Sequence, residues 1–309
     1  MKNFINISDC SSAELRAIIE EAKKRKQNRS GLNKSAHDAD KPFEGKSMAM
    51  IFEKPSTRTR VSFEIGMKQM NGEVVILDQN DTQLGRGESI KDTIKVLSNY
   101  VDIIMYRGSS KERLSEIVEN STVPIINGLT DLSHPCQIMA DLMTLEERFQ
   151  SLNKLKICWV GDGNNVCNSW IHACKHFNFK LNIATPATFK PKKKELTKVV
   201  NFEEKIEIFN NPNDAISGAD VVVTDTWFSM GLEDKKNLRD FEGYQINKSL
   251  MHQAKPDAFF LHCLPAHRGQ EVTDEVIDGP NSLVWEEAKN RLFIQKAILI
   301  WCLRMENKT

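Results

Sequence analysis

Five consecutive polar residues, Ser56-Thr57-Arg58-Thr59-Arg60, stand where an apolar run over residues 48–52 gives way to a helical pattern with Phe63, Met67 and Met70 on one face. A helix N-terminus leaves backbone N–H groups unpaired and carries partial positive charge. Hydroxyl and guanidinium groups added at that point are typical of a phosphate site. An ordinary capped helix with solvated arginines is the alternative, but three hydroxyls and two arginines in register favour the anion site.

Further hydrogen-bond donors follow other apolar runs of the first half. Arg107 comes directly after residues 103–106, while His134 and Gln137 stand at the start of another helical pattern. Ligands of open α/β sheets bind outside the carboxyl ends of the strands, so we expect these side chains to share one site. Arginines suit a phosphate, and an imidazole with a hydroxyl suits a polarised carbonyl oxygen. A lone histidine near a helix start is otherwise more often structural.

The second half places a different set of polar residues after its apolar runs. A glycine turn at residues 161–165 follows one run, but it lacks the GxGxxG spacing of a nucleotide site. Asp225 and Ser229 follow another run. A carboxylate combined with Asn and Ser suits an amine or amino acid, whereas Asp225 alone would be a turn or cap residue.

Cys263 beside His262 raises the possibility of a thiol nucleophile, because thiolate chemistry needs an adjacent base. Neighbouring residues of a strand point to opposite faces, so this pair is not automatically a dyad, and the same geometry argues against both residues binding one metal ion. Four-ligand zinc spacing is also missing, so we expect no metal. A buried, inert thiol is the interpretation that composition favours.

The composition limits the partners of the chain. Lys plus Arg and Asp plus Glu both number 42, so no overall field attracts nucleic acid or an acidic membrane. The seven cysteines lack CxxC pairs, which fits reduced thiols in a cytosol. The longest apolar stretch, residues 297–301, is too short to span a bilayer. We therefore expect a soluble cytoplasmic protein.

Short apolar runs alternate with helical patterns along the chain of 309 residues, which is long enough for two domains. This alternation predicts an α/β fold of two domains, each a parallel β-sheet flanked by helices. The polar stretch at residues 150–154 suggests a boundary between domains 1–150 and 151–285. A final helical segment, 286–309, is apolar on more than one side, and we expect it to pack back onto the first domain.

Four motifs together resemble the aspartate/ornithine carbamoyltransferase family, in the family's order and over nearly the whole chain. They are Phe52-Glu53-Lys54-Pro55-Ser56-Thr57-Arg58-Thr59-Arg60, His134-Pro135-Cys136-Gln137, Asp225-Thr226-Trp227-Phe228-Ser229-Met230-Gly231 and His262-Cys263-Leu264-Pro265. Cysteine at the third position of the second motif and the Ser-Met-Gly of the third are similar to the branch that uses ornithine as the acceptor.

The resemblance implies two groups of binding residues. Those for carbamoyl phosphate are Ser56, Thr57, Arg58, Thr59, Gln83, Arg107, His134, Gln137, Arg291 and backbone groups of Cys263 and Leu264. Those for L-ornithine are Asn165, Asp225, Ser229 and Met230. Gln83 matches a residue that the family delivers from a neighbouring subunit, so the resemblance also implies a homotrimer or a multiple of trimers.

The reaction implied is transfer of the carbamoyl group to the δ-amine of ornithine, giving L-citrulline and phosphate in arginine metabolism, without a cofactor or covalent enzyme intermediate. By resemblance, Arg107, His134 and Thr59 stabilise the carbonyl oxygen, Arg58 the leaving phosphate, and Asp225 with Cys263 orients the amine. The group that finally takes the proton stays open. The alternatives are another acceptor, such as putrescine or an acylated ornithine, and a non-catalytic phosphate-binding protein, which the presence of both sets of residues disfavours.

Overall fold

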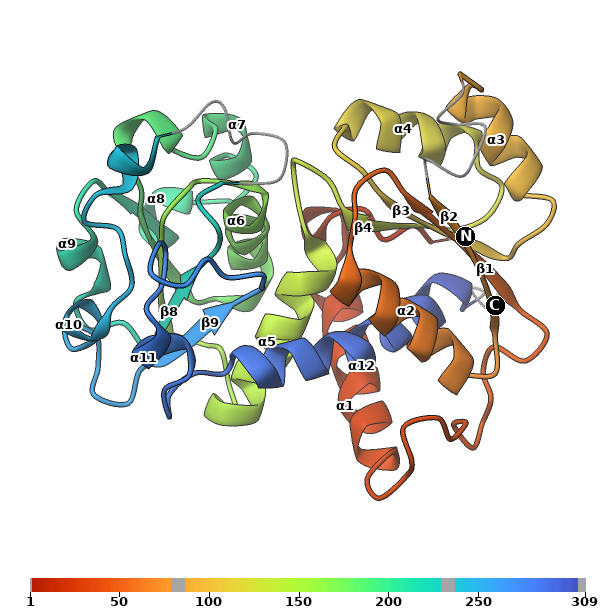
Figure 1. Ribbon diagram of the computed structural model, residues 1–309, viewed down its shortest axis with the longest axis horizontal. Helices are drawn as coiled ribbons and strands as arrows, with labels where there is room; N and C mark the ends of the chain where they lie inside the picture. Colours follow the sequence, from red (N-terminus) through yellow and green to blue (C-terminus); the bar gives the residue numbers. More distant parts are fainter. Residues whose placement is uncertain (1, 79–86, 229–236, 305–309) are drawn as a thin grey trace. The chain divides into compact units, whose positions relative to one another are not determined.

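The computed structural model describes residues 2–78, 87–228 and 237–304 (Figure 1). The chain divides into two compact units. Unit 1 comprises Met1–Ala140 and Lys289–Thr309, and unit 2 comprises Asp141–Ala288. Each unit contains one parallel β-sheet with helices packed on it, which confirms the predicted fold class.

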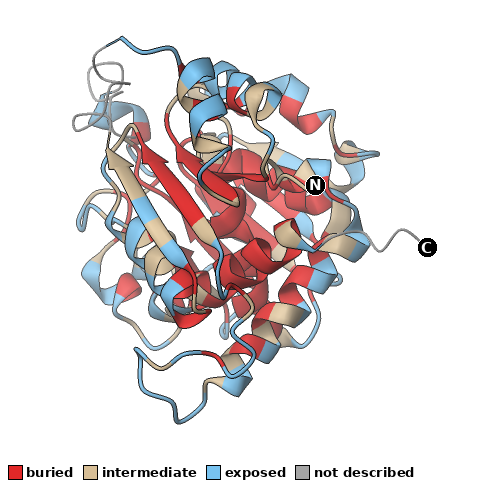
Figure 2. Ribbon diagram, turned by 90° about the vertical axis from the view of Figure 1, so that its right-hand side faces the viewer, coloured by how far each residue is buried: buried red, intermediate tan, exposed pale blue. Residues whose placement is uncertain are grey.

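The sheet of unit 1 has the strand order β2-β1-β3-β4. Its strands are β1 (Ser47–Phe52), β2 (Glu73–Asp78), β3 (Ile103–Arg107) and β4 (Ile125–Leu129). The inner strands β1 and β3 are almost entirely buried, as Figure 2 shows, because helices cover both faces of a parallel sheet. The edge strand β2 is less buried, and Val75 on it is half-exposed.

The helices of unit 1 cover both faces of this sheet. They are α1 (Ser12–Asn28), α2 (Thr57–Gln69), α3 (Ile90–Leu97), α4 (Lys111–Asn120), the first residues of α5 (Pro135–Phe149) and the part of α12 (Val284–Leu303) from Lys289 onward. In Figure 1, α3 and α4 lie on one side of the sheet, and α1, α2 and α12 on the other. Ile94 of α3 and Ile117 of α4 share one apolar cluster with Ile51 and Ile104 of the sheet.

The sheet of unit 2 has the order β7-β6-β5-β8-β9. Its strands are β5 (Lys156–Val160), β6 (Lys180–Ala184), β7 (Ile206–Phe209), β8 (Val221–Thr224) and β9 (Phe259–His262). Its helices, besides the remainders of α5 and α12, are α6 (Asn165–Phe177), α7 (Lys193–Leu196), α8 (Phe202–Lys205), α9 (Pro212–Ile216), α10 (Lys248–Met251) and α11 (Asp274–Ile277). Short 3-10 helices lie at Ile7–Asp9, Ala187–Phe189 and Leu238–Phe241. In Figure 1, α6 lies on one side of this sheet and α9 with α10 on the other.

The apolar runs predict strands near residues 48–52, 73–77, 101–106, 123–126, 155–160, 181–185, 206–209, 220–224 and 258–261. Each of these strands is present, with small differences at the ends. The largest difference concerns β4, which was expected to end at residue 126 and reaches Leu129. Asn127 is buried within β4 and donates through Nδ2 to Ile5 O and Ser133 Oγ, at 3.0 and 3.1 Å. Because its hydrogen bonds compensate for burial, Asn127 can lie inside β4 although it is polar. A prediction based on apolar runs therefore ends the strand too early.

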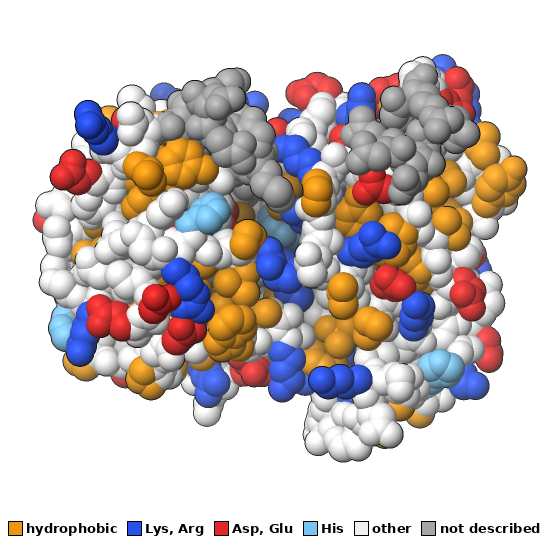
Figure 3. Space-filling model, viewed as in Figure 1, with side chains coloured by type: hydrophobic (Ala, Val, Ile, Leu, Met, Phe, Trp, Pro, Cys, Tyr) orange, Lys and Arg blue, Asp and Glu red, His pale blue; other side chains and the backbone are white. Residues whose placement is uncertain are grey.

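The surface agrees with the balanced composition. On the face shown in Figure 3, Lys and Arg side chains are interspersed with Asp and Glu. None of the helices in the described residues is long and apolar enough to cross a membrane.

Candidate active site

The N-terminus of α2 is built differently from the N-termini of α3 and α4. Ser56 occupies the N-cap position in extended backbone, but its side chain makes no capping hydrogen bond. Ser89 and Ser110, by contrast, cap α3 and α4 with their hydroxyls. Thr57 is exposed and Arg58 is half-buried at the same turn. The start of α2 therefore offers N–H groups, hydroxyls and a guanidinium, the donor set that binds a phosphate.

Thr59, in the first turn of α2, is the centre of a buried cluster. Its Oγ1 accepts hydrogen bonds from Arg107 Nη1 at 3.0 Å and from Arg291 Nη2 at 3.2 Å. Arg291 Nη1 also donates to Gln137 Oε1. All four residues are more than nine-tenths buried. Two guanidinium groups are thus fixed by the same hydroxyl.

The sheet explains why these residues meet. β1 and β3 are neighbours, and the last residue of β1, Phe52, pairs with the last residue of β3, Arg107. β4 lies on the other side of β3, and the chain continues from it to His134. The carboxyl ends of these strands therefore deliver the start of α2, Arg107 and His134 to one edge of the sheet, as expected for a ligand site in this class of fold.

His134 is buried directly before α5. Burial, together with the nearby guanidinium groups of Arg291, Arg107 and Arg58, holds the pKa of His134 well below its usual value of 6.5. The imidazole is therefore neutral at neutral pH. A neutral imidazole donates one hydrogen bond without adding charge, which suits a carbonyl oxygen that gains negative charge during a reaction.

Glu53 lies between β1 and the start of α2 and brings a carboxylate close to this cationic region. Its Oε2 accepts from Tyr106 Oη at 2.6 Å, and Oε1 forms an ion pair with Arg113. Its backbone N–H donates to Arg107 O at 2.9 Å. In the sequence, Glu53 stands out only as part of a motif. In the structure, its carboxylate forms an ion pair with Arg113, a partner that the sequence spacing does not predict.

In unit 2, a glycine turn leads from β5 into α6. Gly161 has a φ of +131°, a conformation that favours glycine, and a Cβ added to Gly163 would lie 2.4 Å from Phe189 O. Asn164 follows as the N-cap of α6, and its Oδ1 accepts from Val166 N and Cys167 N. The tight turn therefore fixes the position of Asn164, and α6 begins at Asn165.

Asp225 is buried directly after β8 and has two polar partners. Its Oδ2 accepts from Asn164 Nδ2 at 2.8 Å, and its Oδ1 accepts from Cys263 Sγ at 3.1 Å. Asn165 is one of the predicted site residues, whereas Asn164 is not. The available signal was the N-cap pattern, an asparagine directly before an apolar helix.

The expected separation of His262 and Cys263 is wrong. His262 is the last residue of β9, so the alternation of side chains within a strand does not extend to Cys263. Donor atoms of Asp225, His262 and Cys263 lie within 4.8 Å of one another. Both ring nitrogens of His262 already have partners, because Nδ1 accepts from Leu264 N at 2.9 Å and Nε2 lies 3.2 Å from Glu271 Oε1. A metal ion at His262 would have to displace one of these contacts.

The chemistry of Cys263 follows from its surroundings. Burial, and then the adjacent carboxylate of Asp225, raise the pKa of the Cys263 thiol well above its usual value of 9.0. The sulfur is therefore protonated at neutral pH, which disfavours a thiolate nucleophile. Leu264, the next residue, has a φ of +58°, and its N–H bond to His262 Nδ1 holds this left-handed backbone in place.

Stacked aromatic rings support the segment that follows Asp225. Phe241 lies between Trp227 and Phe189, with ring centroids 5.0 Å apart in both pairs. Three predicted site residues, Gln83, Ser229 and Met230, lie outside the described residues.

The two clusters define an α/β protein that brings phosphate-binding donor groups together in unit 1 and a carboxylate-thiol pair together in unit 2. The chain matches the family described as "Aspartate/ornithine carbamoyltransferase, carbamoyl-P binding domain" over residues 2–147 and "Asp/Orn binding domain" over residues 153–302. The chain belongs to the aspartate/ornithine carbamoyltransferase family.

Individual relatives agree with this assignment. The chain is 52% identical to ornithine carbamoyltransferase of Brucella suis, covering 98% of this chain and 96% of the relative. It is 51% identical to the enzyme of that name from Nitrobacter winogradskyi, covering 98% and 97%. The solved structure of ornithine carbamoyltransferase from Pyrococcus furiosus superposes with a TM-score of 0.90 at 43% identity, covering 96% of each chain.

Proposed function

We propose that this chain transfers the carbamoyl group of carbamoyl phosphate to the δ-amine of L-ornithine, giving L-citrulline and phosphate. The observation that carries this proposal is the set of three guanidinium groups around the neutral imidazole of His134. Such a set stabilises an anion and a polarised carbonyl oxygen together, which is what carbamoyl phosphate presents.

The phosphate of carbamoyl phosphate binds at the start of α2. Ser56, Thr57 and Arg58 bring two hydroxyls and a guanidinium to a helix N-terminus, whose partial positive charge favours an anion. As the bond to the carbamoyl carbon breaks, the leaving phosphate gains charge. The interaction with Arg58 then strengthens, so this residue lowers the barrier as well as binding the substrate.

The carbamoyl oxygen binds at the buried cluster. Arg107, His134 and Thr59 donate to this oxygen. The hydrogen bonds of Thr59 with Arg107 and Arg291 hold two of these donors in place before the substrate arrives. Removing one preorganised donor of this kind costs about 3 kcal/mol in the transition state. Gln137 and Arg291, with backbone groups of Cys263 and Leu264, complete the carbamoyl-phosphate site.

Ornithine binds to unit 2 through Asn165, Asp225, Ser229 and Met230. Its δ-amine must attack in the unprotonated form, although an alkyl ammonium has a pKa of about 10.4 in water. Asp225, held by Asn164 and Cys263, orients this amine through a carboxylate whose position is fixed. The amine then attacks the carbamoyl carbon, the C–O bond to phosphate breaks, and no bond to the enzyme forms.

We further propose that the chain works as a homotrimer, or a multiple of trimers, in the cytoplasm and in arginine metabolism. In this assignment, residues 1–150 with the C-terminal segment 286–309 bind carbamoyl phosphate, and residues 151–285 bind ornithine. Gln83 of one subunit reaches the carbamoyl phosphate of its neighbour. The 51–52% identity to ornithine carbamoyltransferases supports these finer assignments.

Two measurements on the purified chain test the proposal. Incubation with carbamoyl phosphate and L-ornithine is expected to release citrulline and phosphate in equal amounts. Calorimetry is expected to show binding of carbamoyl phosphate but not of NAD or ATP. Binding without turnover would support a non-catalytic phosphate-binding protein, and tight binding of NAD or ATP would overturn the assignment of the anion site.

A further inference from the structure

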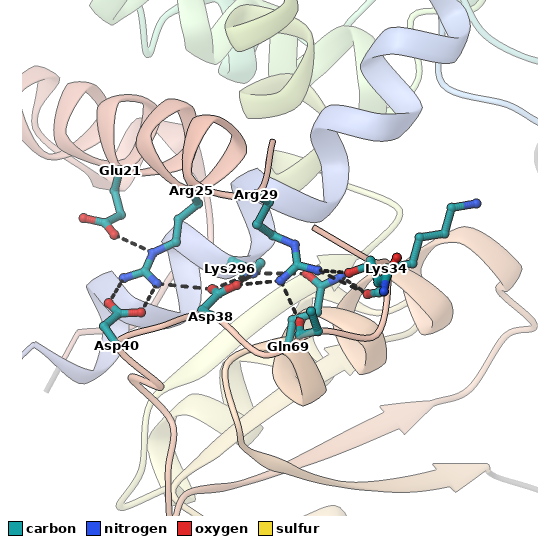
Figure 4. A network of polar contacts seen from close by, with 10 residues as sticks. Glu21, Arg25, Arg29, Lys34, Asp38, Asp40, Gln69 and Lys296 are labelled. Carbon is teal, nitrogen blue, oxygen red and sulfur yellow. Dashed lines mark hydrogen bonds and ion pairs between the residues drawn. The ribbon is translucent and has the colours of Figure 1, made fainter. Parts of the chain in front are cut away.

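A fully buried lysine in α12 joins two segments of unit 1 (Figure 4). Lys296 Nζ lies 2.8 and 2.7 Å from the two carboxylate oxygens of Asp38 and 3.1 Å from Gln69 Oε1. Burial lowers the pKa of Lys296 to about 8, and Asp38 opposes that shift, so the ammonium form prevails at neutral pH. The lysine thus places a charged, three-donor group among acceptors from outside its own helix.

Asp38 does not depend on Lys296 alone. Its Oδ1 accepts from Arg29 Nη1 at 2.8 Å, and its Oδ2 accepts from Arg25 Nη1 at 3.2 Å. Arg25 also contacts the carboxylates of Glu21 and Asp40. Loss of the lysine therefore leaves Asp38 paired with two arginines of α1 and its vicinity, rather than stranded as an isolated buried charge.

Gln69 connects this network to α2, of which it is the last residue. Its Nε2 donates to Lys34 O, and its backbone oxygen accepts from Asp38 N, both at 2.7 Å. Close to Gln69, α2 and α12 touch at Gly66, where an added Cβ would lie 3.2 Å from Lys296 Cγ. Lys296 therefore fixes the end of α2 against α12.

The other end of α2 is joined to α12 by two of the predicted site residues. Thr59 of α2 accepts a hydrogen bond from Arg291 of α12 at 3.2 Å. The same two helices are thus tied twice, once at the buried cluster and once at Lys296. Both helices are stiff between these two contacts. The contact of Lys296 with Gln69 therefore helps to set the position of Arg291 relative to Thr59.

We propose that Lys296 is a positioning residue for carbamoyl phosphate, acting through Gln69 and α12 on the placement of Arg291 against Thr59. This inference rests on the proposed function. A buried ion pair adds little to stability compared with apolar packing. Here the contacts with Asp38 and Gln69 fix where the ammonium group of Lys296 lies. Replacing Lys296 by methionine keeps the length and most of the volume of the side chain, so the substitution removes the tie while retaining the packing.

The test compares Lys296→Met with Lys68→Met. Lys68 is an exposed residue of α2 beside Gln69, and its ion pair is with Glu64 of the same helix. Lys296→Met is expected to raise the KM for carbamoyl phosphate and the Kd for inorganic phosphate about tenfold, because a small misplacement of a binding group has effects of this order or larger. The KM for ornithine stays within about twofold, and Lys68→Met behaves like the wild type.

Gln69→Leu provides an independent variant, because it leaves the ion pair of Lys296 with Asp38 intact and removes the acceptor on α2, together with the side-chain hydrogen bond from Gln69 to Lys34 O. Gln69→Leu is expected to raise both the KM for carbamoyl phosphate and the Kd for inorganic phosphate. This variant tests the proposal even if Lys296→Met fails to fold. The inference is overturned if folded Lys296→Met matches Lys68→Met, or if Gln69→Leu leaves phosphate affinity unchanged. A wild-type chain that makes no citrulline would instead overturn the proposed function.

Discussion

The thiol of Cys263 donates a hydrogen bond to Asp225 Oδ1 across 3.1 Å. This contact makes the cysteine a hydrogen-bond donor to a carboxylate. Burial, and then the charge of Asp225, raise the pKa of the thiol and keep the sulfur protonated. In the proposed reaction the pair orients the amine of ornithine, and the sulfur forms no bond to carbon.

Cys263→Ser is accordingly expected to lose only part of the activity. A serine hydroxyl also donates to Asp225, although its shorter bond to carbon places the donor less well. We expect turnover to fall about tenfold to a hundredfold, the range for a weakened orienting contact. Mass spectrometry of the wild type during turnover is expected to show no adduct on Cys263. A trapped carbamoyl adduct, together with complete loss of turnover in the serine variant, would establish a thiol nucleophile instead.

Arg58→Gly is expected to abolish most activity without unfolding the chain, because Arg58 is only half-buried at the start of α2. Loss of a charge-assisted phosphate contact that tightens in the transition state costs about 2–4 kcal/mol, or roughly thirtyfold to a thousandfold in kcat/KM. Arg60→Gly is the matched control, since Arg60 is an exposed arginine of the same turn. Turnover of Arg58→Gly equal to that of the control would remove Arg58 from the site.

Much of this architecture could be predicted from the sequence, because buried parallel strands are continuous apolar runs and their polar neighbours mark the ligand edge. The contacts of Asn164 with Asp225 and of Glu271 with His262 could not be predicted from the sequence. The sequence pattern predicts only that Asn164 caps a helix. Its contact with Asp225 arises because β5 pairs with β8 in the folded sheet. The contact of Lys296 with Asp38 also depends on tertiary packing, because the two residues are 258 positions apart in the sequence.

His134 is expected to stay neutral in the folded protein well below pH 6.5. The unfolded chain takes up a proton at this residue near pH 6.5, whereas the folded chain does not, so the contribution of His134 to stability falls as the pH drops below that value. NMR of ring-labelled histidine, assigned with a His134→Asn variant, is expected to show a neutral His134 at pH 5.5. An imidazolium signal at pH 6 would contradict both the pKa direction and the role of His134 as a neutral donor.

The proposed sharing of Gln83 between subunits predicts complementation. Gln83→Ala and Arg58→Gly subunits are each expected to be impaired when assembled alone. In mixed trimers, some sites combine an intact Gln83 from one subunit with an intact Arg58 from the next, so part of the activity returns. The measurement is citrulline formation after unfolding and refolding the two variants together, with subunit exchange confirmed by mass. Failure of activity to return after confirmed exchange would count against shared sites and leave the reaction itself unaffected.

The most direct test of the central claim is a comparison of acceptors. The purified wild-type chain is supplied with saturating carbamoyl phosphate and, in separate reactions, L-ornithine, putrescine or N-acetylornithine, and kcat/KM is measured for each from phosphate release and product mass. Ornithine is expected to exceed both others by at least about a hundredfold, because a site with buried polar groups for the amino-acid end rejects acceptors that leave those groups unpaired. A higher kcat/KM for putrescine or N-acetylornithine would contradict the assignment of ornithine as the acceptor.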